Sequence, residues 1–187
     1  MIYIKDDFLE KDLIDKLNRD KSSFQKVETP GKSFWVKIPS DDFLQLVCDK
    51  ISNIENCCIK PILGFFREAK ENQDNDWRIH NDSIIEGQRP DRAAVLYVSE
   101  EKFNGLNGTA FWEHKMYGDK FLDESPERYD KLIIEDSNDL DKWILKSIVG
   151  HKQNRLLSYP CDYFHSKYPH EFIDSRVVFV LFYKIEK

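Results

Sequence analysis

The sequence predicts an α+β protein that is mainly β, because two helical segments come first and many short strands follow. The chain has 187 residues, which is enough for one domain with a sizeable hydrophobic core. Hydrophobic residues make up 41% of it and charged residues 33%, with only 7 Gly and 7 Pro, so the chain is globular and not disordered. Short strands at nearly regular spacing favour a barrel or a sandwich.

The N-terminal part is expected to form a helical support for these strands. Its expected elements are a strand at 1–4, a helix at 6–20, a strand at 33–38 and a helix at 40–54. Asp7 and Glu10 have the spacing of a capping box for the first helix. Ser40 is the expected N-cap of the second helix.

From Lys60 onward the pattern changes to short runs of branched and aromatic residues separated by turn residues. These runs predict strands at 61–69, 77–83, 93–99, 108–114, 154–160, 162–167 and 175–185. An insertion at about 115–150 interrupts them, with helices expected at 125–133 and 139–148, capped by Ser125 and by Ser137 or Asp139. We interpret residues 1–187 as a single domain, with helical support over 1–58 and a β core with this insertion over 59–187.

Composition argues against two classes of partner. The formal net charge is −6, which argues against a broad nucleic-acid-binding face. No apolar run approaches the roughly 18–20 residues that span a bilayer.

The N-terminus carries no secretory signal, so we expect reduced thiols and a cytoplasmic protein. The four cysteines, none of which forms a C-x-x-C pair, are Cys48, Cys57, Cys58 and Cys161.

The chemistry is expected to start from His80 and Asp82. In a strand, residues i and i+2 point to the same face, so this imidazole and this carboxylate would converge on one point. Such a pair is half of a metal site, or a surface pair without function. A second histidine, His165, lies in the C-terminal third. Two His and one carboxylate form the facial triad that binds non-haem Fe(II) and leaves coordination positions open.

Arg176 is the residue that distinguishes between these interpretations. It opens the apolar run 177–183, and a guanidinium at the start of a buried strand is costly unless it meets an anion. Because a guanidinium forms two parallel hydrogen bonds to a carboxylate, Arg176 suits a dicarboxylate ligand. A structural ion pair with Asp or Glu is the alternative.

In these residues the chain resembles the Fe(II)/2-oxoglutarate-dependent dioxygenases, and most of all their prolyl-4-hydroxylase-like branch. The resemblance covers about residues 60–187 and follows the family pattern of H-x-D, a distant His, and an Arg or Lys a short way further on. The matching residues are, in order, His80, Asp82, His165 and Arg176. The resemblance implies a double-stranded β-helix (jelly-roll, cupin-like) core and the use of Fe(II), 2-oxoglutarate and O2.

By this resemblance, His80, Asp82 and His165 would bind the metal. Arg176 and Tyr97 would bind the distal carboxylate of 2-oxoglutarate. His165 is preferred to His170 as the distal ligand, since His170 lies only six residues before Arg176.

Other residues near these motifs are candidates for lining the substrate cleft. They are Arg92, Trp112 and His114, together with Trp77 and Arg78.

The implied activity is hydroxylation of a peptide or protein side chain, with proline possible, or of a small metabolite, with release of succinate and CO2. Phe182 stands six residues after Arg176, where the nucleic-acid-demethylating branch has a second Arg, which counts against nucleobase repair. Two alternatives stay open. One is a catalytically idle barrel that serves as a binding module. The other is a 2-oxoglutarate-independent, cupin-like metal protein, which would have no need of Arg176.

Overall fold

A computed structural model describes residues 1–20, 24–29, 32–70, 79–82, 84–100, 107–121, 125–169 and 175–186. Its elements are β1 (Tyr3–Lys5), α1 (Lys11–Arg19), β2 (Gln25–Thr29), β3 (Lys32–Lys37), α2 (Asp41–Glu55), β4 (Cys58–Ala69), β5 (Arg92–Tyr97), β6 (Gly108–His114), α3 (Pro126–Asp136), a short 3₁₀ helix (Leu140–Lys142), β7 (Trp143–Gly150), β8 (Leu156–Pro160), β9 (His165–Tyr168) and β10 (Arg176–Glu186). Among the described residues, no helix has the length and apolar character needed to cross a bilayer.

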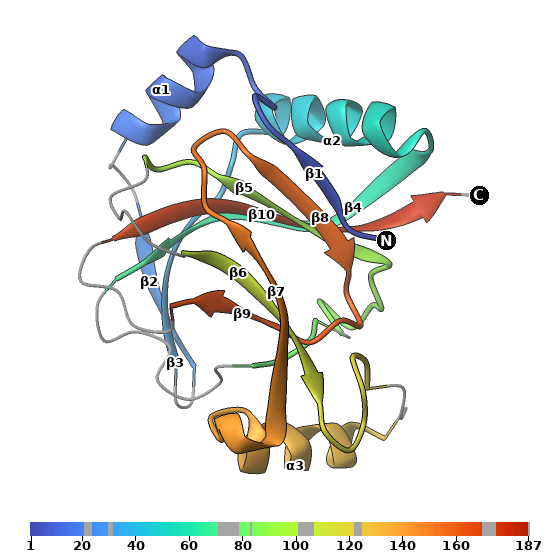
Figure 1. The fold of residues 1–187 in the computed structure, drawn as a ribbon. Helices are drawn as coiled ribbons and strands as arrows, with labels where there is room; N and C mark the ends of the chain where they lie inside the picture. Colours follow the sequence, from blue (N-terminus) through green and yellow to red (C-terminus); the bar gives the residue numbers. More distant parts are fainter. Residues whose placement is uncertain are drawn as a thin grey trace.

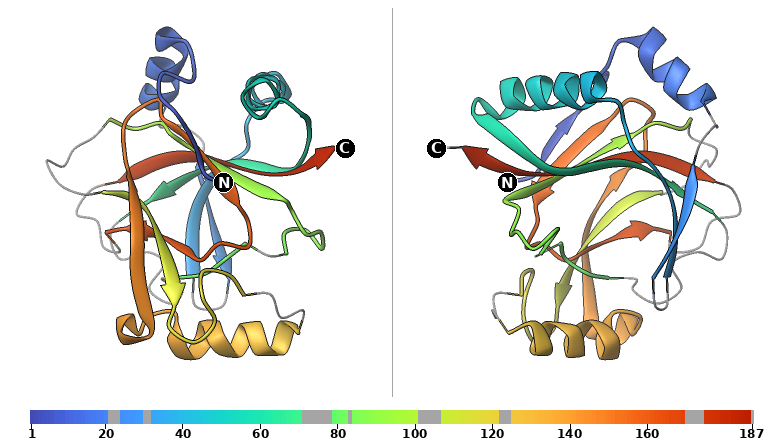
Figure 2. Two further views of the ribbon diagram at one scale, coloured as in Figure 1. Left: turned by 45° about the vertical axis from the view of Figure 1, so that its right-hand side comes forward. Right: turned by 180° about the vertical axis from the view of Figure 1, so that it is seen from behind.

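The strands form two antiparallel sheets. The larger sheet has the order β1-β8-β5-β10-β4-β3-β2, and the smaller has the order β7-β6-β9. Helices α1 and α2 lie on the outer side of the larger sheet, and α3 lies at the far end of the smaller one (Figure 1). The view from behind shows α1 and α2 on the same side of the larger sheet and α3 at the opposite end of the molecule (Figure 2).

Strand β10 is buried on both faces, which explains its nearly continuous apolar sequence. Phe179 and Leu181 pack beneath α2 in a core cluster that includes Val47. Val178 and Phe182 belong to a second cluster, which is formed by residues of both sheets and therefore lies between them. Alternate residues of one strand thus fill two cores, as the two-residue period of a strand requires.

The ends of the first two helices differ in how well the sequence predicts them. The side chain of Ser40 accepts a hydrogen bond from the Phe43 N–H at 3.3 Å, so the predicted cap of α2 is confirmed. The predicted start of the first helix is wrong. Asp7 has a left-handed backbone (φ 52°) and α1 begins only at Lys11, after a Glu10 that makes no side-chain cap hydrogen bond.

The predicted helix at 139–148 is also wrong. Apart from the 3₁₀ helix, this segment joins β7, which pairs antiparallel with β6 over its length. The open edge of β6 offers backbone partners to a segment rich in Ile and Val, and this pairing overrides the local helical pattern. Ser125 does cap α3, accepting from the Arg128 N–H at 3.4 Å, so the helical part of the insertion is α3 and the 3₁₀ helix.

Two further strands depart from the expectation. The sequence pattern missed β2, which pairs with β3. Of the strand expected at 77–83, only residues 79–82 are described, and they make a single isolated bridge and no regular strand.

A buried ion pair ties the end of α2 to the larger sheet. The Glu55 carboxylate lies 2.9 Å from Arg92 Nε and accepts hydrogen bonds from Ser158 (2.8 Å) and from the Tyr183 hydroxyl. The side chains of Arg92 and Glu55 are only 8% and 3% exposed. One carboxylate thus joins α2 to strands β5, β8 and β10.

We expect Arg92→Met to lower the free energy of unfolding by about 3–5 kcal/mol, because it leaves the Glu55 carboxylate buried without its cation. Urea denaturation measures the loss. The double variant Arg92→Met/Glu55→Gln keeps an oxygen acceptor without the charge and should recover most of the lost stability. A double variant no more stable than Arg92→Met would contradict this role of the ion pair.

Candidate metal centre

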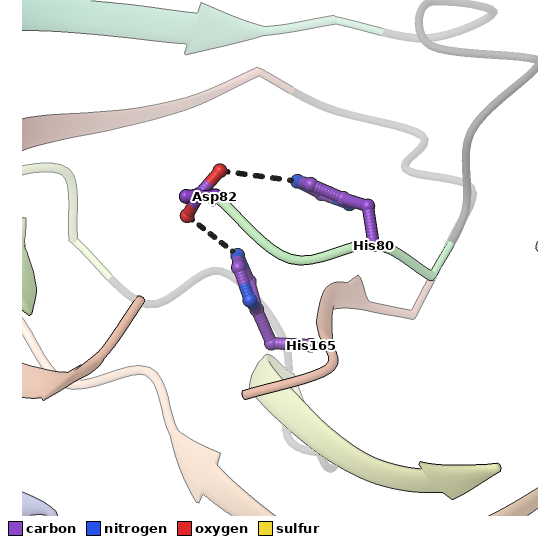
Figure 3. Close-up of side chains that lie close together, drawn as sticks. All are labelled: His80, Asp82 and His165. Atoms are coloured by element: carbon purple, nitrogen blue, oxygen red, sulfur yellow. Dashed lines mark ion pairs between the residues drawn. The ribbon is translucent and has the colours of Figure 1, made fainter. Parts of the chain in front are cut away.

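Three side chains meet between the two sheets. Nε2 of His165 lies 3.3 Å from one Asp82 carboxylate oxygen, and Nε2 of His80 lies 3.8 Å from the other (Figure 3). One ligand atom from each residue lies within 4.8 Å of the other two, and no second group of this kind occurs in the described part of the chain. Metal–ligand bonds of about 2.0–2.2 Å place neighbouring ligand atoms roughly 3 Å apart, so a small contraction would suffice to bind an ion.

Backbone contacts hold the three residues in place. His80 N donates to the His165 carbonyl at 3.0 Å, and His165 N donates to the His80 carbonyl at 2.8 Å. Asp82 N donates to the Cys161 carbonyl at 2.9 Å. The residues that precede the two histidines, Ile79 and Phe164, are fully buried in a third cluster beside α3. Because neighbouring side chains of an extended chain alternate, these apolar anchors direct both imidazoles toward the space between the sheets.

The hydrogen bond on the other ring nitrogen fixes how His165 can act. Its Nδ1 lies 3.0 Å from the Tyr163 carbonyl, which can only accept, so Nδ1 carries the proton. Nε2 then has the lone pair that a metal ligand requires. Two imidazoles and one carboxylate form a donor set that suits a divalent first-row transition metal and leaves coordination positions open.

The electrostatics of the cluster keep its carboxylate ionised. Burial raises the pKa of Asp82, but His165, through its charge and hydrogen bond, together with His80 and Arg67, outweighs burial and holds the pKa below its ordinary value. Burial lowers the pKa of His165, and Asp82 more than offsets it, so that pKa lies above its ordinary value. A metal ion binds the neutral imidazole, so protonation of His165 in acid would compete with metal binding.

Arg176 and Tyr97, the predicted 2-oxoglutarate residues, also lie together between the sheets. Arg176 Nη1 donates to the Gly108 carbonyl at 2.9 Å, and its guanidinium carbon lies 5.9 Å from the centre of the Tyr97 ring. The Tyr97 hydroxyl is hydrogen-bonded to Thr109 at 2.7 Å. Burial raises the pKa of Tyr97, so the hydroxyl stays protonated and can donate.

Two more cationic residues accompany Arg176, and the sequence analysis missed both. Burial and the charge of Arg176 lower the pKa of Arg67, on β4, to about 10. Burial, followed by the charges of Arg67 and Arg176, lowers the pKa of Lys167 to about 7. Lys167 follows His165 by two residues on β9 and so shares its face. Arg176 was identified as a cation on an apolar strand. Arg67 has the same feature, because it follows Phe65 by two residues on the apolar strand β4.

The structure does not bring the predicted substrate residues to this cluster. Arg92 belongs to the ion pair with Glu55. Trp112 donates from its indole nitrogen to Ser166 Oγ at 2.9 Å within the cluster beside α3. His114 lies 3.1 Å from Asp136 and is 3% exposed.

Each of these three side chains is therefore engaged in packing or in a structural contact. Trp77, Arg78 and His170 lie outside the described residues.

Comparison with known proteins shows the fold. No protein-family model matches the sequence, and no curated protein matches it. Among solved structures, HygX from Streptomyces hygroscopicus with nickel, 2-oxoglutarate and hygromycin B bound matches with a TM-score of 0.64 at 13% identity, over 98% of this chain and 82% of that one. A Pseudomonas putida prolyl-4-hydroxylase matches with a TM-score of 0.56 at 11% identity, over 100% and 93%. The non-haem α-ketoglutarate-dependent epimerase SnoN matches with a TM-score of 0.60 at 9% identity, over 98% and 78%.

One of these neighbours was solved with 2-oxoglutarate bound, one is a prolyl-4-hydroxylase and one is an α-ketoglutarate-dependent epimerase. The chain shares their double-stranded β-helix fold, and the predicted jelly-roll core with N-terminal helices is confirmed.

His151, behind Tyr97, makes the stability of the protein depend on pH. Its ring stacks on Tyr97 with centroids 4.7 Å apart, and its Nε2 donates to the Ser99 carbonyl at 2.8 Å. Burial lowers the pKa of His151 to about 4. An unfolded histidine has a pKa of about 6.5, so below that pH the unfolded state binds a proton that the folded state excludes. Stability is therefore lost as the pH falls from about 6.5 toward 4.

We expect His151→Gln to remove this loss, which amounts to about 2 kcal/mol between pH 7.5 and pH 4.5. The amide keeps a donor for the Ser99 carbonyl. Urea denaturation of both proteins at both pH values gives the difference, in which the contributions of other acidic groups cancel. Equal losses in the two proteins would show that His151 does not cause the acid sensitivity.

Proposed function

We propose that the protein is a non-haem Fe(II)- and 2-oxoglutarate-dependent dioxygenase. The observation that carries this proposal is the cluster of His80, Asp82 and His165 between the sheets of a double-stranded β-helix. Its two imidazoles and one carboxylate are the donor set of the facial triad in non-haem Fe(II) oxygenases. A bound Fe(II) ion, with 2-oxoglutarate and O2, would supply the oxidising chemistry.

In this proposal the protein side chains bind and orient the reactants. His80, Asp82 and His165 would hold the metal with a face open to the co-substrate. Arg176 is anchored through Nη1 to the Gly108 carbonyl, so its guanidinium is held in place to bind a carboxylate. Tyr97, kept protonated by burial, would donate its hydroxyl to the same carboxylate.

The charge of the interior also favours a dianionic co-substrate. Arg176 lies close enough to Arg67 to disfavour the charge of Arg67, and Asp82 is also near Arg67. A dicarboxylate bound between the metal and Arg176 would bring negative charge into this region, where a low local dielectric strengthens the attraction. The burial of Arg176 is consistent with a site built for an anion.

We propose that the reaction is a hydroxylation that releases succinate and CO2. Its substrate would be a peptide or protein side chain, with proline possible, or a small metabolite. Two similarities that cover nearly the whole chain support these classes: HygX was solved with hygromycin B bound, and another neighbour is a prolyl-4-hydroxylase. We further propose a cytoplasmic location, because all four cysteines are free thiols, as a reducing compartment requires.

Anaerobic addition of Fe(II) and then 2-oxoglutarate to the apoprotein tests the proposal. We expect a visible charge-transfer band from chelated 2-oxoglutarate in the wild type. The band should be absent in His165→Ala, which lacks a metal ligand. At the same 2-oxoglutarate concentration it should be several-fold weaker in Arg176→Ala, because the distal carboxylate loses its cation.

Arg19→Ala is the matched control for Arg176→Ala, since Arg19 is exposed on α1, and its band should equal that of the wild type. A wild type that binds Fe(II) without producing the band would favour a 2-oxoglutarate-independent, cupin-like metal protein. A wild type that does not bind Fe(II) would favour a catalytically idle binding module.

A further inference from the structure

The helix α3 contacts the chain at the residue between the first two proposed metal ligands. The hydroxyl of Tyr129, on α3, donates to the Asn81 carbonyl at 2.9 Å and accepts from the Asn81 N–H at 3.1 Å. These residues are 48 positions apart in the sequence. One side-chain hydroxyl thus satisfies both backbone polar groups of Asn81.

The two contacts fix two different peptide planes. The Asn81 N–H belongs to the peptide that links it to His80, and the Asn81 carbonyl belongs to the peptide that links it to Asp82. Because a peptide unit is planar and stiff, a group that holds both units limits how each can rotate. The directions in which His80 and Asp82 leave the backbone depend on these same rotations.

The same region of the insertion makes a second contact on the other side of His80. Ile79 N donates to the carbonyl of Ser137, the C-cap residue of α3, at 3.2 Å. The Ile79 side chain is fully buried in the cluster that contains Leu132 of α3. Hydrogen bonds from the α3 region therefore flank His80 at both neighbouring residues.

The Tyr129 hydroxyl is suited to a fixed role. Its ring packs against Phe121 with centroids 5.9 Å apart, which limits its movement. Burial raises the pKa of Tyr129 far above its ordinary value, so the hydroxyl keeps its proton. A protonated hydroxyl can donate to the carbonyl and accept from the N–H at once, which is the pattern seen at Asn81.

We propose that Tyr129 is a positioning residue for the metal centre. The helical insertion would then help to orient the metal ligands, in addition to lying beside the site. This inference rests on the proposed Fe(II) function. Groups that orient metal ligands from outside the coordination sphere typically change metal affinity about 10–100-fold when they are removed. Tyr129 acts on the backbone that carries two ligands, so its loss is expected to act on both.

The test uses Co(II) as the probe, because its visible d–d spectrum reports the geometry of the ligands and not only their presence. Tyr129→Phe removes the hydroxyl and keeps the ring against Phe121. We expect its Co(II) dissociation constant to rise about tenfold. The spectrum at saturating Co(II) should also differ from that of the wild type in band position or intensity.

Tyr117→Phe is the matched control. Tyr117 packs on the same Phe121 ring, with centroids 5.3 Å apart, and it lies outside the contact with Asn81. This variant should bind Co(II) with wild-type affinity and spectrum. Thermal unfolding of the metal-free proteins, followed by circular dichroism, should show Tyr129→Phe folded at the titration temperature.

The outcomes distinguish failure of the proposed metal site from failure of the proposed role of Tyr129. A wild type that fails to bind Co(II) would overturn the proposed metal site, and the role of Tyr129 with it. If the wild type binds Co(II) and Tyr129→Phe matches Tyr117→Phe in affinity and spectrum, only the positioning role is overturned. A lower unfolding temperature without a change in affinity or spectrum would give Tyr129 a purely structural role and would overturn the inference as well.

Discussion

The backbone bridge between His80 and His165 is the contact on which the rest of the site depends. Two hydrogen bonds of 3.0 and 2.8 Å join a segment outside the named strands to β9. The bridge sets the register of His80 and, two residues on, of Asp82, and a slip by one residue would turn both side chains to the other face. The apolar anchors Ile79 and Phe164 specify this register, because the same slip would remove them from the hydrophobic cluster beside α3.

Positive charge inside the β-helix carries a stability cost that the fold must offset. Arg67, which is half-buried, lies near the buried Arg176, and desolvation disfavours the charged form of both. The aromatic core beneath α2, where Phe43 packs on Phe179 with centroids 5.1 Å apart, supplies apolar burial well away from the cluster of ligands. The outer face of the sheet thus packs a hydrophobic cluster beneath α2, whereas the inner face combines a second hydrophobic cluster with the charged groups of the site.

The sequence predicted what depends on local spacing and missed what depends on tertiary partners. Its pattern of His, Asp and His named residues whose side chains do meet, and Ser40 caps its helix as expected. The helix expected at 139–148 became a strand because the edge of β6 was available to it. Trp112 was a reasonable candidate, but alternation places it opposite Phe111, and only the fold tells which of the two faces the interior. Arg67 was missed because it belongs to no motif itself, and only the fold brings it near Arg176 and Asp82.

The contact between Tyr129 and Asn81 has a thermodynamic consequence for the insertion. Coupling between two sites is reciprocal, so if α3 strengthens metal binding, a bound metal stabilises the docking of α3 by the same free energy. A tenfold effect on affinity corresponds to about 1.4 kcal/mol, a large share of the marginal stability of a single helix docked on a domain. Helix α3 and the segment from Ile79 to Asp82 would then order together. The Cys161 carbonyl also holds the other end of this segment. The contribution of α3 is therefore to restrict the segment to one of the backbone conformations that the bridge to β9 allows.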